Sequence, residues 1–352
     1  MTRPTLSDVA RQAGVSVSTA SLAFSGAGPI AEATRARVRT AATELGYAGP
    51  NPLGRQLRSG RSGIIGVVVG DHLKRSFRDP VSVQVLDGLV STLGAASLGV
   101  LLVPSAGSQT VDPLLETAVM DVAVLIWGTH RDDPRVATLR RRGTPFVVGE
   151  GIQLDDAPVV GIDDRAGVAE LARHLANLGH RRFATITLPL SSHRCSGWVD
   201  TERRRLADWT PTKHRLEGLE DAGVDVVATY ETEASLVENG HAAMLALLDR
   251  FPDRATRPTA VVAQSDLLAA GAILAARERG VRVPEDLSVA GFDGLDLPWL
   301  GTDRLTTVRQ PLAEKGAAIA HAVQALLAGE TPESVVLPVE LVLGTTTAPP
   351  AP

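Results

Sequence analysis

The sequence contains a single cysteine, few aromatic residues and no long apolar run. Cys195 has no second cysteine with which to form an internal disulfide, which is typical of a chain from a reducing compartment. The first ten residues are polar overall, and no apolar run reaches the roughly 18 residues of a membrane-spanning helix, so neither a signal peptide nor a membrane span is predicted. We therefore expect a cytoplasmic protein with no membrane contact.

The sequence also lacks the common motifs of enzymes. No GxGxxG follows the first expected strand, and neither a GxxxxGK[ST] phosphate loop nor a GxSxG nucleophile turn is present. The eight histidines are scattered, and His193 and Cys195 have no further ligand pair at zinc spacing. We expect no catalytic residues, no metal and no cofactor, and hence no enzyme.

The charge of the chain is unevenly distributed. The formal net charge is −5, which by itself argues against a nucleic-acid partner. Residues 1–62, however, contain eight arginines and three acidic residues, a net charge of +5, so the remaining residues carry −10. A basic N-terminal unit on an acidic body can bind phosphate at one end while the body resists nonspecific contact with DNA.

Residues 5–24, TLSDVARQAGVSVSTASLAF, predict two short amphipathic helices joined by a tight turn. Thr5 and Asp8 form a capping-box-like start, Gly14 supplies the turn, and Ser16 can cap the second helix. The residues expected to face inward are Val15, Thr19, Ala20 and Ala23. The residues then left outward are Val17, Ser18, Ser21 and Leu22.

This stretch resembles the DNA-binding headpiece of the LacI/GalR family of bacterial transcription regulators. The family pattern TLxDVAxxAGVSxxTVSxxLxG is matched here by TLSDVARQAGVSVSTASLAFSG. The family continues with a third helix and an LGY, and residues 34–47, TRARVRTAATELGY, do the same. Capped helix pairs also occur in other small helical domains, but the length and density of this match favour the resemblance.

A short helix is predicted after the breaker cluster at residues 49–52. Asn51 can cap residues 52–58, PLGRQLR, in which proline takes the first helical position. The resemblance implies the family's hinge helix, which orders on operator DNA, pairs with its dimer mate and inserts a leucine into the minor groove. Leu57 falls at that leucine's position, although it could instead be a linker residue that packs on the body. Gly54 replaces the family's usual alanine, which should cost roughly 1 kcal/mol of helix propensity.

From Gly63 onward, short apolar strands alternate with helices. Examples are the expected strand GIIGVVVG, the helix DRAGVAELARHLANLG and the strand PTAVVAQS. This alternation predicts an α/β fold with parallel sheets covered by helices on both faces. About 290 residues are long for one such sheet, so two similar lobes are expected.

The body resembles the family's effector domain, which is similar to periplasmic sugar-binding proteins, with two lobes, a cleft and three crossing strands. The matching pieces are HLANLGHRRFATI (174–186), RPTAVVAQSDLLAAGA (257–272), VRVPEDLSVAGFD (281–293) and LTTVRQP (305–311). The chain departs from the family between Leu188 and His214, where an insertion lengthens the connection.

The resemblance implies three parts of the chain. They are a helix-turn-helix headpiece at 1–48, a hinge segment at 49–62, and an effector-binding and dimerisation domain at 63–346. Within that domain we expect one lobe to consist of 63–162 with 292–322, and the other of 163–291 with 323–346.

The resemblance also implies which residues read DNA bases, namely the two after Ser16 and one further along the second helix. Many family members carry arginine at the Leu22 position, where it can clamp a guanine, whereas leucine can make only an apolar contact, for example with a thymine methyl. The alternative is that Leu22 is buried. The predicted DNA-binding residues are Thr5, Ser16, Val17, Ser18, Thr19, Ser21, Leu22, Asn51 and Leu57.

A second set of residues is implied for the cleft. Arg215 lies three residues before a glycine in the helix after the insertion, as the family's ligand arginine does. Carboxylates and a guanidinium that converge on a cleft suit a hydroxyl-rich ligand, although they could instead pair as structural ion pairs across the lobes. Phe77 and Trp127 could stack on a sugar or belong to the core. The predicted effector-binding residues are Phe77, Trp127, Asp163, Asp164, Arg215, Ser265, Asp266 and Asp293.

These features predict a homodimeric, sequence-specific regulator, a repressor, that binds double-stranded operator DNA and is controlled by a small polar effector such as a saccharide. Closure of the lobes would change the separation of the two hinge segments, so effector binding and DNA binding should affect each other reciprocally. The alternative is a cytoplasmic solute-binding or sensing protein that does not act on DNA, against which the basic headpiece argues.

Two substitutions in the hinge segment should change operator affinity in opposite directions. Gly54→Ala should tighten binding, by up to about tenfold for each roughly 1.4 kcal/mol gained, because glycine has more backbone freedom to lose when the hinge folds on DNA. Leu57→Ala should weaken binding because it removes the side chain that holds the minor groove open. Operator titrations that leave both variants within about twofold of wild type would show that the hinge neither folds nor inserts.

Overall fold

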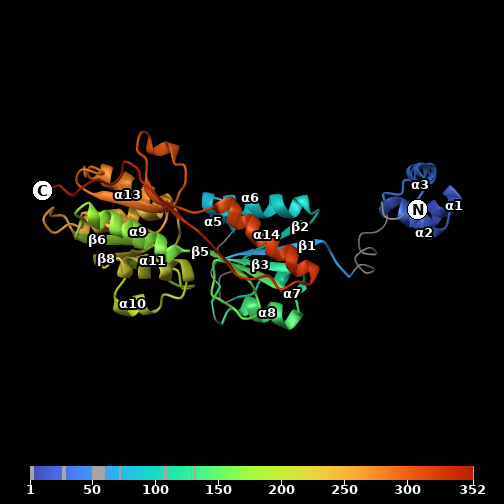
Figure 1. Ribbon diagram of the computed structural model, residues 1–352, viewed down its shortest axis with the longest axis horizontal. Coiled ribbons are helices and arrows are strands. Elements are labelled where there is room, and N and C mark those ends of the chain that lie inside the picture. The colour runs from blue at the N-terminus through green and yellow to red at the C-terminus, as the bar shows by residue number, and fades with distance from the viewer. Residues whose placement is uncertain are drawn as a thin grey trace. The chain divides into compact units, whose positions relative to one another are not determined.

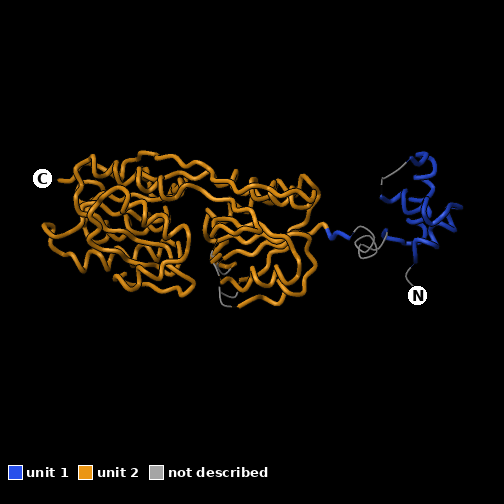
Figure 2. Tube along the Cα trace, turned by 60° about the horizontal axis from the view of Figure 1, so that its bottom comes forward, with its two compact units in different colours: residues 1–62 blue, residues 63–352 orange. Residues whose placement is uncertain are grey.

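The structure is a computed structural model that describes residues 4–25, 29–49, 60–70, 73–105, 110–127, 129–130 and 132–351. The chain divides into two compact units, residues 1–62 and residues 63–352 (Figure 2). Within the described ranges, no helix is long and apolar enough to cross a membrane. Asn51, Gly54 and Leu57 lie outside these ranges, so the hinge helix stays a prediction.

The described part of the first unit contains three helices, α1 (Leu6–Ala13), α2 (Val17–Ser25) and α3 (Glu32–Leu45). The predicted capping box is present, since the amide of Asp8 donates to Thr5 Oγ1 at 3.3 Å and the amide of Thr5 donates to Asp8 Oδ2 at 3.0 Å. Helix α1 ends at Gly14, whose φ of 65° favours glycine. Both ends of α1 are therefore set by local signals in the sequence.

A small apolar core joins these three helices. Val9 of α1, Ala20 of α2 and Val38 of α3 are fully buried in it. At its edge the rings of Phe24 and Tyr47 meet edge to face, with centroids 5.6 Å apart. The inward face predicted for α2 is confirmed at Ala20 and Ala23, which are both buried.

The second unit consists of two α/β lobes, each with a largely parallel sheet between helices (Figure 1). Lobe 1 has the strand order β12-β5-β4-β3-β1-β2. Its strands are β1 (Ile64–Val69), β2 (Gly99–Val103), β3 (Val122–Ile126), β4 (Phe146–Gly149), β5 (Val159–Ile162) and β12 (Val335–Leu337). Its helices are α5 (Leu73–Ser76), α6 (Pro80–Ala95), α7 (Pro113–Thr117), α8 (Pro134–Arg142) and α14 (Leu312–Ala328).

Lobe 2 has the strand order β13-β11-β10-β9-β6-β8-β7, in which β13 and β7 are antiparallel to their neighbours. Its strands are β6 (Arg182–Thr187), β7 (Gly197–Trp198), β8 (Asp225–Glu231), β9 (Ala260–Ala263), β10 (Ser288–Asp293), β11 (Thr306–Arg309) and β13 (Glu340–Val342). Its helices are α9 (Asp164–Asn177), α10 (Thr201–Arg205), α11 (Thr210–Asp221), α12 (Val237–Arg250), α13 (Asp266–Glu278) and the 3-10 helix η1 (Pro298–Leu300).

Both faces of each sheet are buried. In β1, Val67 belongs to the core formed with α6 and α14, whereas its neighbour Val68 belongs to the core on the opposite face. Successive side chains of a strand point to opposite faces, so a strand that is apolar throughout fits a sheet covered on both sides. The predicted α/β architecture with parallel sheets is confirmed.

The chain crosses between the lobes at three places, and two of them differ from the expected limits. The crossing from β5 to α9 lies at 162–164, as expected. Residues 292–309 stay in lobe 2, however, because β11 pairs with β10, and residues 323–337 stay in lobe 1, because β12 pairs with β5. The expected limits at 292 and 322 were therefore wrong, and these crossings lie at 309–312 and 337–340.

Helices α6 and α14 lie side by side on lobe 1 and approach closely at glycine (Figure 1). A Cβ atom on Gly88 would lie 2.1 Å from the carbonyl oxygen of Ala313, and one on Gly316 would lie 2.1 Å from that of Val85. Since α14 follows directly on the second crossing, this contact fixes where the crossing segment joins lobe 1.

Replacing Gly88 with alanine should therefore destabilise the protein. The added methyl group meets backbone, and overpacking of this kind costs about 1–3 kcal/mol of the free energy of unfolding. Gly94→Ala in the same helix is the matched control, because nothing lies within 4 Å of its Cβ and alanine gains up to about 1 kcal/mol of helix propensity. Chemical denaturation of both variants checks this, and equal stabilities would contradict the close approach.

Candidate functional site

The second helix of the first unit presents the residues predicted to read DNA. The Oγ of Ser16 accepts the amide of Thr19 at 3.1 Å and so caps α2, as expected. The side chains of Val17 and Leu22 are 48% and 39% exposed, and Ser18 is exposed as well. The alternative that Leu22 is buried is therefore wrong, whereas its contact with a base stays a prediction.

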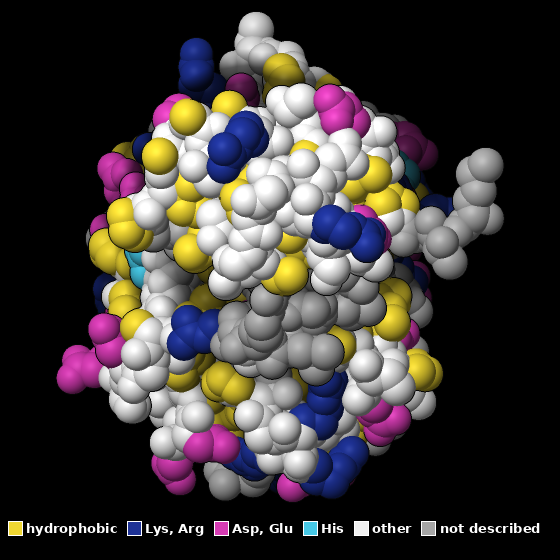
Figure 3. Space-filling model, turned by 90° about the vertical axis from the view of Figure 1, so that its right-hand side faces the viewer, with side chains coloured by type: hydrophobic (Ala, Val, Ile, Leu, Met, Phe, Trp, Pro, Cys, Tyr) yellow, Lys and Arg dark blue, Asp and Glu magenta, His cyan; other side chains and the backbone are white. Residues whose placement is uncertain are grey.

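The other residues of the predicted DNA-binding set differ in their surroundings. Thr5 is exposed and its hydroxyl donates to Asp8 Oδ2 at 2.6 Å, while Ser21 and Thr19 are half-buried. Asn51 and Leu57 lie outside the described ranges. On the face shown in Figure 3, Lys and Arg side chains form several separate groups between hydrophobic and acidic ones, not one continuous patch.

A cavity of about 110 Å³ lies between the two lobes of the second unit, at the carboxyl ends of their strands. In lobe 1, Gly70, Trp127 and Glu150 directly follow β1, β3 and β4. In lobe 2, Leu188 and Gln310 directly follow β6 and β11. Parallel α/β sheets commonly bind ligands at this edge, because loops there converge from several strands.

The backbone is strained at this edge. Trp127, Glu150 and Asp293 line the cavity with φ angles of 59°, 52° and 133°, in a region that residues other than glycine rarely adopt. Strain of this kind persists where surrounding contacts impose it, and it is concentrated at binding sites. Here the indole N–H of Trp127 donates to Glu150 Oε2, so a hydrogen bond joins two of the three strained residues.

A buried chain of polar groups runs from lobe 1 to lobe 2 beside the cavity. Lys315 Nζ donates to Glu150 Oε1 at 2.8 Å and to Gln310 Oε1 at 2.6 Å. Gln310 Nε2 then donates to Asp293 Oδ1 at 2.6 Å. Burial alone would raise the pKa of Glu150, but the neighbouring Lys315 holds it below its usual value.

Arg215 of α11 lies at the lobe 2 end of this chain. Its Nε donates to Asp164 Oδ1 at 2.7 Å, its Nη1 donates to the carbonyl of Gln264, and its guanidinium lies 3.7 Å from the ring centroid of Phe292. Asp293 Oδ1 is 4.0 Å from Nη1. The alternative of an ion pair across the lobes is wrong, because the carboxylates next to Arg215 belong to lobe 2. Arg215 also lines the cavity, and its contact with a ligand stays a prediction.

The structure brings four of the eight predicted effector residues to the cavity, namely Trp127, Arg215, Ser265 and Asp293. The other four are not among its lining residues. Phe77 is 57% exposed, and Asp163 caps α9 by accepting the amide of Ala166 at 3.0 Å. Asp164 accepts a hydrogen bond from Arg215, and Asp266 is fully buried.

Asp266 has a structural environment of its own. It accepts the hydroxyl of Thr307 at 2.6 Å and the amide of Leu295 at 2.7 Å. Burial raises its pKa to about 6 despite these hydrogen bonds. Asp266 was predicted to line the cleft because it matches a family position, but its side chain contacts Thr307 of β11 and is not among the lining residues.

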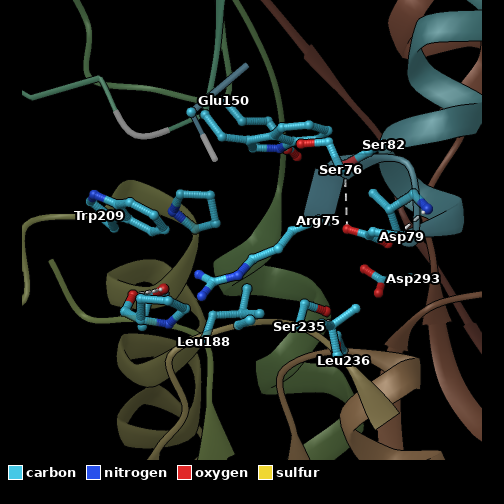
Figure 4. Close-up of a pocket in the computed structure, with 18 of the residues that line it drawn as sticks. Arg75, Ser76, Asp79, Ser82, Glu150, Leu188, Trp209, Ser235, Leu236 and Asp293 are labelled. Carbon is cyan, nitrogen blue, oxygen red and sulfur yellow. Dashed lines mark hydrogen bonds between the residues drawn. The ribbon is translucent and has the colours of Figure 1, made fainter. Parts of the chain in front are cut away.

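Several lining residues were not predicted from the sequence. Figure 4 shows Trp209 on the side of the pocket opposite Asp79 and Asp293, with Arg75 extending between them. Glu150 follows an apolar strand directly, which is a signal that could have identified it. Trp209 and Arg194 lie in the insertion, for which the family pattern offers no guide. In the described part of the chain, no group of three His, Cys, Asp or Glu side chains could hold a metal ion.

Two family models match the chain. One, described as bacterial regulatory proteins of the lacI family, matches residues 5–51. The other, a periplasmic binding protein-like domain, matches residues 172–347. The first covers the helix-turn-helix and the second covers most of lobe 2 together with the last two crossings.

Similar proteins cover nearly the whole chain. The HTH-type transcriptional regulator Rv3575c of Mycobacterium tuberculosis is 34% identical over 99% of this chain and 98% of its own. The structure of a complex of the transcriptional regulator CelR with cellobiose is 29% identical, with a TM-score of 0.69 over 98% of this chain and 100% of that one. A LacI family transcriptional regulator from Enterococcus faecium with bound ribose has a TM-score of 0.64 at 23% identity, over 81% of this chain and 99% of that one.

Arg215→Ala should both abolish ligand binding and lower the stability of the fold. It leaves the buried carboxylate of Asp164 without its partner, which costs about 3–5 kcal/mol of the free energy of unfolding. The double variant Arg215→Ala/Asp164→Ala should recover much of that stability but not the binding. Calorimetry with a ligand that binds the wild type measures the loss of binding, and chemical denaturation measures the loss of stability. Unchanged ligand affinity in the double variant would leave Arg215 with a structural function alone.

Proposed function

We propose that this chain, which belongs to the LacI family of bacterial transcriptional regulators, is a homodimeric repressor that binds operator DNA. Its activity is controlled by a small polar effector in the cleft between its lobes. The observation that carries this proposal is that one chain combines a helix-turn-helix, whose second helix exposes Val17 and Leu22, with a polar cavity at the carboxyl ends of two sheets. The relatives named above are transcriptional regulators and not enzymes, which agrees with the lack of common enzyme motifs in the sequence.

We propose that the effector is an uncharged, hydroxyl-rich molecule, most simply a saccharide. Side chains with ionisable groups of both signs line the cavity: Arg75, Arg194, Arg215, Asp79, Glu150 and Asp293. Hydroxyl groups can donate to the carboxylates and accept from the guanidinium groups, so a hydroxyl-rich molecule can pair with both kinds of side chain. The cellobiose and ribose bound in two similar structures support a saccharide.

A surface of lobe 1 supports the homodimer. Val83 and Val90, seven residues apart on α6, are 43% and 47% exposed, although both are apolar. Residues seven apart lie on one helix face, and exposed apolar side chains that gather on one face mark interaction surfaces. Two copies packed through α6 would form a homodimer with two N-terminal units, as binding to a two-part operator requires.

The proposal requires DNA binding to reside in the first unit. The affinity for the operator should fall steeply as the salt concentration rises. For each phosphate that the protein contacts, the logarithm of the binding constant should fall by about 0.9 when the salt concentration increases tenfold. A truncated chain that begins at Gly63 should lose operator binding and retain effector binding, because the second unit is compact by itself. Gel shift and fluorescence anisotropy with the upstream region of the protein's own gene measure this. Binding by the truncated chain as tight as that of the full chain would disprove the assignment.

A further inference from the structure

Two segments of opposite charge border the cavity, one from each lobe. Residues 73–79, LKRSFRD, form α5 and lead into α6 in lobe 1, and they contain three basic residues and one acidic residue. Residues 231–238, ETEASLVE, lead from β8 into α12 in lobe 2, and they contain three acidic residues and no basic one. Side chains of both segments are among the lining residues of the cavity.

Two ion pairs join these segments across the lobes. Arg78 Nη2 donates to Glu238 Oε1 at 2.6 Å, and Arg75 Nη2 lies 3.8 Å from Glu233 Oε1. The side chains of Arg78 and Glu238 are 53% and 55% exposed, so this pair lies at the surface. Both arginines belong to lobe 1 and both carboxylates belong to lobe 2, so the two pairs link the lobes in addition to the three chain crossings.

Arg194 of the insertion adds a third link beside these pairs. Its Nη2 donates at 3.2 Å to the carbonyl of Gly70, which directly follows β1 in lobe 1. Its Nη1 donates at 3.0 Å to the carbonyl of Glu233, the residue whose carboxylate faces Arg75. Glu233 therefore connects the link through Arg194 with the ion pair of Arg75, and the contacts form one group.

Contacts of this strength can influence how the lobes are placed. The closely packed helix pairs of the second unit each lie within one lobe, α6 with α14 in lobe 1, and α9 with α11 and α12 with α13 in lobe 2. A movement of one lobe against the other can therefore leave these pairs intact. An exposed ion pair changes an equilibrium constant by up to about fivefold. Where a protein has two arrangements, the minor one commonly accounts for about 0.1–10% of the molecules, so changes of this size alter its population.

We propose that Arg75, Arg78 and Arg194 form an electrostatic latch with Glu233, Glu238 and the carbonyl of Gly70, and that this latch holds the lobes together over the cavity before any ligand binds. Arg78 and Glu238 do not line the cavity, whereas Arg75 extends into it (Figure 4). The latch thus reaches from the protein surface to the ligand space. It goes beyond the proposed function, because it concerns the chain without a ligand and does not depend on a saccharide effector.

The test measures the distance between the lobes in the ligand-free full chain by pulsed electron paramagnetic resonance. Spin labels are attached through Glu116→Cys in lobe 1 and Glu202→Cys in lobe 2, which replace exposed side chains, in a Cys195→Ser parent. Dilution with unlabelled protein restricts the measurement to pairs of labels within one chain. The parent should show one dominant distance.

Reversal of charge in the latch should populate a second distance. Arg78→Glu places a carboxylate opposite Glu238, and it should raise the ratio of the second distance to the first by about fivefold or more. The addition of Arg75→Glu should raise that ratio by about as much again. Arg78→Glu/Glu238→Arg restores opposite charges in reversed order, and it should return the ratio to within about twofold of the parent.

Arg279→Glu is the matched control. It makes the same change of charge at an exposed arginine, whose Nη1 donates to Asp249 at 2.7 Å, but both of these residues belong to lobe 2. Its distance distribution should therefore equal that of the parent. Circular dichroism checks that each variant is folded.

The outcomes separate the latch from the proposed function. Arg78→Glu and Arg75→Glu/Arg78→Glu that both keep the distances of the parent would overturn the latch, and so would an equal change in Arg279→Glu or no recovery in Arg78→Glu/Glu238→Arg. A parent in which a second distance already dominates would also overturn it. None of these results bears on the effector, whereas failure of every sugar to bind would refute the saccharide effector and leave the latch to be judged by the distances.

Discussion

The arrangement of the cleft depends on the buried ion pair between Lys315 and Glu150. Both side chains are almost fully buried, and loss of one partner of such a pair costs about 3–5 kcal/mol, because the other charge is left without compensation. Lys315 stands in the first turn of α14, just after the chain crosses from lobe 2, and Gln310 extends its contacts to Asp293. The crossing is thereby tied to the strand ends of both lobes, at the place where the cavity lies.

This geometry explains how a ligand can act at a distance. A ligand shifts an equilibrium only by the difference between its affinities for the two states, so it must contact both lobes to favour one relative position of them. The lining residues come from both lobes, so a ligand in the cavity can contact both at once. Lobe 1 begins at β1, directly after the first unit in the chain. In a homodimer, a change in the position of lobe 1 relative to lobe 2 would therefore be transmitted to the hinge segments.

Local features of the structure could be predicted from the sequence, and features set by distant pairing could not. The capping box of Thr5 and Asp8 and the turn at Gly14 are encoded within a few residues. The crossing at 309–312, in contrast, depends on the pairing of β11 with β10, which no local pattern reveals. Arg215 and Asp293 follow from the family resemblance, whereas Lys315 lies in a largely apolar helix and is brought to Glu150 only by the order of the sheet.

The central claim is that occupancy of the cleft and binding of the operator are energetically coupled in one protein. The most direct test is the affinity of the full chain for its operator with and without saturating effector, together with its affinity for the effector with and without operator. The account predicts that both affinities change by the same factor, about 5-fold to 150-fold, because coupling between two binding sites is reciprocal. Operator affinity that is identical in the presence and absence of bound effector would contradict it.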